Sequence, residues 1–163
     1  MATKLMGKSI LRKEDHRLVT GKGSYVEDVS LPNMKWMAFV RSPHAHARIK
    51  SINTEAAKKH PGVVAVITDE DLRGRCHDMH GLRLSLFGDM QIPTIPVFAR
   101  DKVWHVGQAI AAVIADERYV AQDATELISV EYEVLPAVVD AEETMEPNAP
   151  RLHEEFTDNV CLS

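Results

Sequence analysis

The sequence has 163 residues, of which 45% are hydrophobic and 26% charged, and its formal net charge at pH 7 is -5. This composition is typical of a globular protein with one ordinary domain or two small ones, because a chain of this length removes about 70% of its unfolded surface from water without a disulfide or metal. The negative charge argues against a nucleic-acid-binding role, which requires basic surface to neutralise phosphates.

The first half of the chain contains three segments with strand-like patterns, after a turn-rich N-terminal stretch. They are residues 36–41, 48–52 and 63–67. The first is a compact apolar run, the second alternates polar and apolar residues, and the third is β-branched and apolar. We expect the second strand to pair with the first. Within residues 1–35, residues 24–29 have the pattern of one short strand.

One short helix and one further helical turn are expected in the same half. Thr54 is suited to cap a helix over residues 55–59, which a Pro-Gly pair ends. Residues 69–72 begin with acidic side chains and predict a single helical turn. Residues 74–96 contain three glycines and two prolines, which predict a long irregular loop. A connection of that length tends to be functional or to form a docking surface.

Strand-like patterns return in the second half, at residues 102–106, 109–115, 129–134 and 137–139. Residues 117–128 carry apolar side chains at helical spacing and predict a helix, which Asp116 is suited to cap. Residues 141–163 are acidic and show little periodicity, as in a linker. Together these elements predict an α+β fold with mixed β-sheet strands, two helices and a long irregular loop. We expect a single domain over residues 1–163, with its core at about residues 8–140.

Neither a membrane span nor a signal peptide is indicated by the sequence. No apolar run approaches the roughly 20 residues that a membrane span requires, and the lysine-bearing N-terminus lacks an apolar stretch of signal-peptide length. Two cysteines, Cys76 and Cys161, are too few for a disulfide framework. We therefore expect a cytosolic location.

His44 and His46 are two residues apart, a spacing that places both imidazoles on one face of a strand, as in some metal sites. No acid or cysteine nearby completes such a site, so we favour ordinary hydrogen-bonding histidines. A nucleophile formed by Cys76 with one of these histidines stays open. Residues 21–24, Gly-Lys-Gly-Ser, resemble half of a phosphate loop, but the third glycine is missing and a turn is favoured.

Cys76, His77 and His80 bring three potential metal ligands within five residues. Catalytic zinc uses three protein ligands, but structural zinc sites come as paired knuckles, and no second pair is present here. Cys161 and His153 lie far along the chain, in the tail. The favoured interpretation is an exposed loop, with a metal site as the alternative. No set of residues predicts a self-contained catalytic site.

Five segments of the sequence, in their order and spacing, nevertheless resemble one known family. They are residues 12–28, 39–49, 61–68, 106–111 and 131–140. The second, Phe-Val-Arg-Ser-Pro-His-Ala-His-Ala-Arg-Ile, is the most specific. The chain resembles the N-terminal α/β hammerhead domain of the molybdenum-cofactor large subunit in the xanthine dehydrogenase, aldehyde oxidase and aerobic carbon monoxide dehydrogenase family, and the resemblance covers about residues 8–159.

The resemblance implies a hammerhead fold within a molybdenum hydroxylase that oxidises aldehydes, N-heterocycles or carbon monoxide with water-derived oxygen. It implies molybdopterin, iron–sulphur clusters and FAD in the complete enzyme, and it implies three partners: the molybdopterin-binding remainder of the large subunit, an iron–sulphur subunit and a flavin subunit. From the net charge and the absence of a long apolar run, we expect no nucleic acid and no membrane as partners. The family's catalytic and cofactor-binding residues lie beyond this domain, so no catalytic, cofactor-binding or metal residue is carried over.

Because the sequence stops about where such relatives enter their next domain, we expect either an excised domain or one product of a split large subunit. The leading hypothesis is a structural or assembly domain that is inactive alone. The alternatives are a self-sufficient metal-binding module that uses Cys76, His77 and His80, and a scaffold for an unrelated partner. Partner contacts are expected from the segment that carries Arg41, His44 and His46, and from the loop at residues 74–96.

Overall fold

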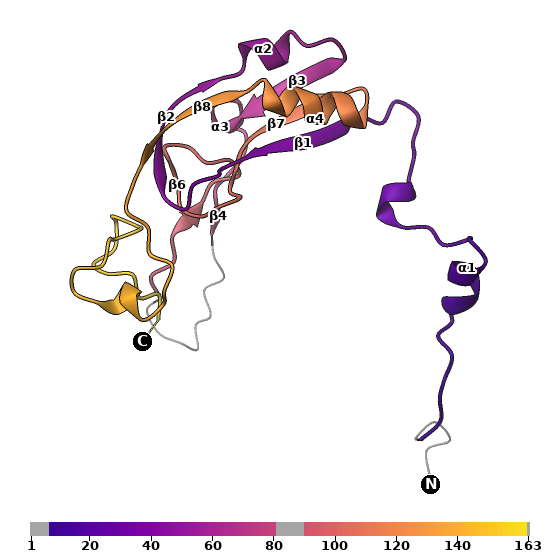
Figure 1. The fold of residues 1–163 in the computed structure, drawn as a ribbon, viewed down its shortest axis with the longest axis horizontal. Coiled ribbons are helices and arrows are strands. Elements are labelled where there is room, and N and C mark those ends of the chain that lie inside the picture. Colours follow the sequence, from indigo (N-terminus) through magenta and orange to yellow (C-terminus); the bar gives the residue numbers. More distant parts are fainter. Residues whose placement is uncertain (1–6, 81–89, 163) are drawn as a thin grey trace. The chain divides into compact units, whose positions relative to one another are not determined.

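The computed structural model describes residues 7–80 and 90–162, and the chain divides into two compact units, Met1–Met34 and Lys35–Ser163 (Figure 1). The described part of the first unit contains α1 (Asp15–Val19) and the 3-10 helix η1 (Val26–Asp28), and neither contains a buried residue. The strand expected at residues 24–29 is wrong. The Asp28 carboxylate accepts a hydrogen bond from the Tyr25 backbone N–H at 2.9 Å, which closes a turn in place of an extended segment.

The second unit is built on two three-stranded antiparallel sheets. The first sheet has the order β1 (Trp36–Arg41), β7 (Ala109–Ala115), β3 (Val63–Thr68). The second has the order β6 (Lys102–Val103), β2 (Ala47–Asn53), β8 (Ser129–Val134). These strands confirm the expected segments, although β6 is shorter than predicted and residues 137–139 form no strand.

The expected pairing of residues 36–41 with 48–52 is wrong, because β1 pairs with β7 whereas β2 pairs with β6 and β8. The chain changes sheets directly after β1. Ser42 donates its backbone N–H to the Gln108 carbonyl at 2.9 Å, and its own carbonyl accepts the Gly107 N–H at 2.8 Å, so the turn stays attached to the start of β7. The strand β7, whose side chains are all apolar, lies at the centre of the first sheet, where both faces of the strand are largely removed from water.

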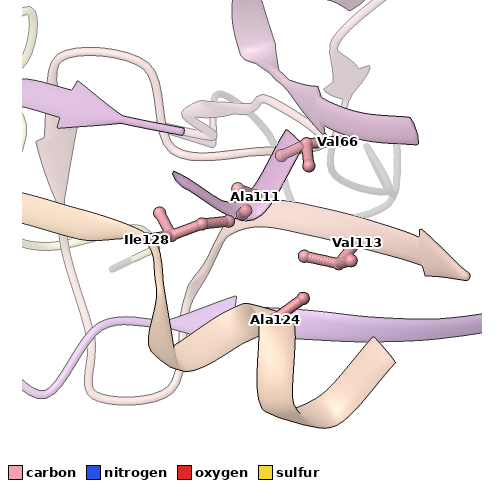
Figure 2. Packing of buried hydrophobic residues seen from close by; sticks show 6 residues of the cluster. Val66, Ala111, Val113, Ala124 and Ile128 are labelled. Carbon is pink, nitrogen blue, oxygen red and sulfur yellow. The ribbon is translucent and has the colours of Figure 1, made fainter. Parts of the chain in front are cut away.

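The longest helix of the described part, α4 (Arg118–Glu126), lies along β1 and β7 (Figure 1). Ala124 projects from it toward the first sheet, where a buried apolar cluster forms (Figure 2). The cluster consists of Ala57, Val66, Ala111, Val113, Ala124 and Ile128. A second cluster, Ala47, Ala99, Val103 and Ile110, joins β7 to the second sheet.

The helix α4 begins later than expected, with Glu117 and not Asp116 at its cap position. Asp116 is engaged elsewhere: its carboxylate pairs with Lys35, and its backbone N–H donates to the Gly62 carbonyl at 2.9 Å. The helix also ends two residues before Ile128, which turns into the core beside β8.

Two single-turn helices, α2 (Glu55–Lys58) and α3 (Asp69–Leu72), confirm the short helix and the helical turn expected from the sequence. Within the described structure, Thr54 makes no side-chain capping bond to α2, and the Asn53 carboxamide oxygen instead accepts the Glu55 N–H at 3.1 Å. The cap of α3 is reciprocal. The Asp71 carboxylate accepts the Thr68 backbone N–H at 2.8 Å, and this hydrogen bond lowers the pKa of Asp71.

The expected loop at residues 74–96 contains a two-stranded sheet, β4 (Met79–His80) paired with β5 (Thr94–Ile95), and its residues 81–89 lie outside the described residues. The tail carries one 3-10 helix, η3 (Glu143–Met145). A membrane-crossing helix is not found anywhere in the described ranges. Antiparallel sheets with few helices confirm the expected α+β fold class.

Candidate functional site

Arg41, the first residue predicted to contact a partner, ends β1 on an apolar surface. Its Nη1 donates to the Gly107 carbonyl at 2.8 Å, and its guanidinium lies 5.3 Å from the centre of the Phe39 ring, within cation–π range. The Phe39 and Met37 side chains on the same strand are 39% and 57% exposed. The charge is therefore held in place beside exposed apolar side chains.

The two predicted histidines do not form a joint site. The ring of His44 meets the edge of the Tyr132 ring, with 4.8 Å between centroids, and burial raises the pKa of Tyr132. His46 is buried, and its Nδ1 lies 2.7 Å from the Pro136 carbonyl, which favours the tautomer with the proton on Nδ1. Its Nε2 finds no hydrogen-bond partner among the described atoms. His46 thus fixes the chain that leaves β8.

Cys76 and His77 follow α3, and both are exposed. They line an open pocket of about 700 Å³. His80 belongs to β4, but its side chain lies outside the described residues. Where side chains are described, no three His, Cys, Asp or Glu groups come close enough to hold a metal ion.

Sequence reasoning missed the ion cluster at the base of this pocket. The Asp69 carboxylate accepts hydrogen bonds from Arg100 Nε at 2.8 Å and Nη2 at 3.2 Å, and from Arg73 Nε at 3.1 Å. Arg100 also donates to Asp78 at 3.0 Å. Burial alone raises the pKa of Asp69, but the hydrogen bonds from Arg100 and Arg73 outweigh it and leave that pKa below its ordinary value. No local pattern marks this cluster, because Asp69 looks like an ordinary acid at a helix start.

These residues do not fit the cofactors that the sequence resemblance implies. The Arg100 guanidinium is shared between two carboxylates, Asp69 and Asp78, so it is already neutralised and is not free to bind an anionic cofactor. Iron–sulphur clusters are typically held by four cysteine thiolates, whereas the whole sequence contains two cysteines, and the described residues bring no group of three metal ligands together. The pocket is therefore a structural feature that ties α3 to the segment before β6.

The acidic tail packs against β6 and against Trp104, which follows that strand. The Trp104 ring stacks on the His153 ring with 5.3 Å between centroids, and Trp104 Nε1 donates to the Leu152 carbonyl at 3.1 Å. Lys102 pairs with Glu154 beside this stack. Burial lowers the pKa of His153, against the opposing effect of the nearby Glu155 carboxylate.

Comparison with known proteins supplies the wider context. The protein-family model described as "Aldehyde oxidase and xanthine dehydrogenase, a/b hammerhead domain" matches residues 20–136. The carbon monoxide dehydrogenase large chain of Afipia carboxidovorans is 49% identical over 161 residues, which cover 98% of this chain and 19% of that protein. The nicotine 6-hydroxylase large subunit of Paenarthrobacter nicotinovorans is 36% identical, with 97% of this chain and 19% of that protein covered.

Solved structures agree with these matches. Quinoline 2-oxidoreductase from Pseudomonas putida 86 superposes with a TM-score of 0.86 and 39% identity, over 95% of this chain and 19% of that chain. A crystal structure of the Cu,Mo-CO dehydrogenase gives a TM-score of 0.79 and 48% identity, over 96% of this chain and 19% of that chain. This chain therefore spans about a fifth of the length of the relatives it matches.

Proposed function

We propose an assembly function for this chain, which belongs to the aldehyde oxidase and xanthine dehydrogenase family as an a/b hammerhead domain. That membership confirms the resemblance found in five segments of the sequence. The chain corresponds to one domain of the large subunit of a molybdenum hydroxylase. Its proposed role is to pack on the molybdopterin-binding remainder of that subunit, and the chain is inactive alone.

One observation carries this proposal: nearly the whole chain matches 19% of the Afipia carboxidovorans large chain and 19% of quinoline 2-oxidoreductase, while its own described residues offer no set of ligands for a metal. The oxidation of an aldehyde, an N-heterocycle or carbon monoxide would then depend on the other four-fifths of the polypeptide. Iron–sulphur and flavin subunits would complete the enzyme in the cytosol, where the free, exposed thiols of Cys76 and Cys161 would persist.

The segment from Arg41 to His46 is proposed to contribute to partner contacts in two ways. Arg41 and His44 present partly exposed groups, whereas the buried His46 shapes the segment from within. The self-sufficient metal module gains no support from Cys76 and His77, which are exposed on an open pocket.

A chimera tests this function in a complete enzyme. In the Afipia carboxidovorans large chain, this chain replaces the 161 matching residues, and the control is the same large chain with that part deleted. Both are expressed in that organism, and carbon monoxide oxidation is followed with an artificial electron acceptor. We expect activity from the chimera and none from the deletion or from the isolated chain. Activity of the isolated chain, or a chimera as inactive as the deletion, would overturn the proposal.

A further inference from the structure

The first sheet is apolar on both faces, and within the described residues α4 packs on one of them. Its central strand β7 reads Ala-Ile-Ala-Ala-Val-Ile-Ala, and a continuous apolar run is typical of a strand that is buried on both sides. The face that carries Val113 and Val66 is covered by α4 (Figure 2). On the opposite face, the second sheet covers the start of β7, where Ile110 packs with Ala47 and Val103. The rest of that face requires a further layer.

The strand register identifies the residues of that opposite face. Met37 lies beside Ile114 and Phe39 beside Ala112 across the β1–β7 pair, and the β3–β7 pair adds Ala65 and Ile67 to the same face. We call this surface, made of Met37, Phe39, Ala65, Ile67 and Ile114, the open face. Every side chain in it is apolar.

Part of the opposite side is already covered, which defines where the open face begins. The ring of Phe98 is 5% exposed and lies 6.4 Å from the Phe39 ring between centroids, and Ala112 between the strands is 1% exposed. Beyond this cover, Met37 and Phe39 are 57% and 39% exposed. An aromatic centre with an arginine at its border is typical of protein–protein contacts, and Arg41 lies beside Phe39 in this way.

We propose that the open face docks on the molybdopterin-binding remainder of the large polypeptide, with Met37 and Phe39 at the centre of the contact and Arg41 at its border. This inference rests on the proposed function and adds the surface that performs it. The occupant follows from the relatives, in which the matching part is 19% of a single longer chain. In those relatives the remainder is covalently joined to the matching part, and this linkage raises its effective concentration at the sheet above that of a second copy or a separate protein.

Photocrosslinking in the chimera tests the location of the contact. A benzophenone amino acid replaces Met37 in one sample and Tyr119 in the control, since Tyr119 is 78% exposed on α4, at the other side of the sheet. We expect crosslinks from position 37 to peptides of the remainder, and few or none from position 119. Crosslinks from position 37 that stay within this chain's own sequence, or that join two copies of it, would overturn the inference. An inactive, unassembled chimera would instead count against the proposed function.

A pair of matched substitutions tests the energetic importance of the open face. Met37→Lys places a charge at its centre, whereas Val134→Lys places one at a 65% exposed strand position on the second sheet. In the chimera, we expect Met37→Lys to increase the rate of proteolysis at the domain junction on the order of tenfold, because a buried unpaired charge is costly, and Val134→Lys to leave it unchanged. In the isolated chain, both variants should keep the wild-type Tm. Equal rates for the two variants in the chimera would contradict the inference.

Discussion

The guanidinium of Arg100 donates two hydrogen bonds to the Asp69 carboxylate, from Nε at 2.8 Å and from Nη2 at 3.2 Å, and so joins α3 to the segment before β6. Two elements that are 31 residues apart are held together by this pair.

Substitution Asp69→Asn should therefore destabilise the fold by about 2 kcal/mol, because it leaves Arg100 and Arg73 without the carboxylate that they share. The Asp69 side chain is 10% exposed. The matched control is Asp116→Asn. The Asp116 side chain is 53% exposed in its pair with Lys35, so this substitution should cost less than about 1 kcal/mol of stability. Urea unfolding measures both variants, and equal losses would contradict the role given to Asp69.

The same carboxylate predicts a loss of stability in acid. The hydrogen bonds from Arg100 and Arg73 outweigh burial and hold the pKa of Asp69 below its ordinary value of 3.8. A pKa that is lower in the folded state gives stability that is complete above the unfolded value and disappears as the pH falls through the folded value. The free energy of unfolding should thus decline below about pH 4.

Asp69→Asn should flatten part of this decline. The rest should remain, because hydrogen bonds from Thr68 and Lys102 lower the pKa values of Asp71 and Glu154. The test is urea unfolding of both proteins at a series of acidic pH values. Parallel curves for Asp69→Asn and the wild type would show that Asp69 is not the group responsible.

Gly62 and Gly74 form a second matched pair, since both have positive φ, at 84° and 74°. An added Cβ at Gly62 would lie 3.2 Å from Val120 Cγ1, whereas no described atom lies within 4 Å of the same position at Gly74. Each alanine substitution should cost about 1–2 kcal/mol for the left-handed backbone, and Gly62→Ala should cost roughly 1 kcal/mol more by overpacking. Chemical denaturation compares the free energies of unfolding of the two variants. In the Val120→Ala background, the extra loss of stability caused by Gly62→Ala should disappear. If the two glycine variants were equally stable, the close contact at Val120 would have no energetic effect.

The tail should open more often when Trp104 is altered. Trp104→Phe removes the hydrogen bond from Nε1 to the Leu152 carbonyl and weakens the stack on His153. The loss of one such bond, about 1 kcal/mol, corresponds to roughly fivefold more opening of the tail and fivefold faster trypsin cleavage after Arg151. The control is Trp36→Phe, which alters the β1 indole that lies beside Arg118 of α4. Trypsin should cleave this variant at the wild-type rate. Unchanged cleavage of Trp104→Phe would show that the tail is held by other contacts.

Metal removal should not affect the isolated chain. Dialysis against EDTA is expected to leave Tm unchanged, and elemental analysis should find no stoichiometric zinc or iron. The matched variant is His80→Ala, which removes one member of the Cys76, His77 and His80 set. Stoichiometric metal that is lost in His80→Ala would establish the metal-binding module instead.

The elements predicted most accurately from the sequence are those with strong local patterns. The strand β1 coincides with its predicted range at Trp36–Arg41, and β7 does so at Ala109–Ala115, because each is a compact apolar run bounded by polar or turn residues. The pairing of β1 was predicted wrongly, since pairing depends on contacts between distant segments. The proline after Ser42 is consistent with the end of β1, but nothing in the local sequence indicates that the chain enters a second sheet there.

The candidate site was less accessible to sequence reasoning for the same reason. Asp69 and Arg100 lie 31 residues apart, and neither has neighbours that distinguish it from a surface charge. His46 was grouped with His44 on spacing alone, but the structure buries it against the Pro136 carbonyl. The family, in contrast, was identified from motifs that do not depend on such contacts.

The molybdenum content of purified protein tests the central claim most directly. Elemental analysis is applied to the isolated chain, to the chimera of the Afipia carboxidovorans large chain, and to that large chain with the matching part deleted. An assembly domain predicts no molybdenum in the isolated chain, an equimolar amount in the chimera, and a marked loss in the deletion. Molybdenum bound to the isolated chain, or a chimera with no more metal than the deletion, would contradict the account.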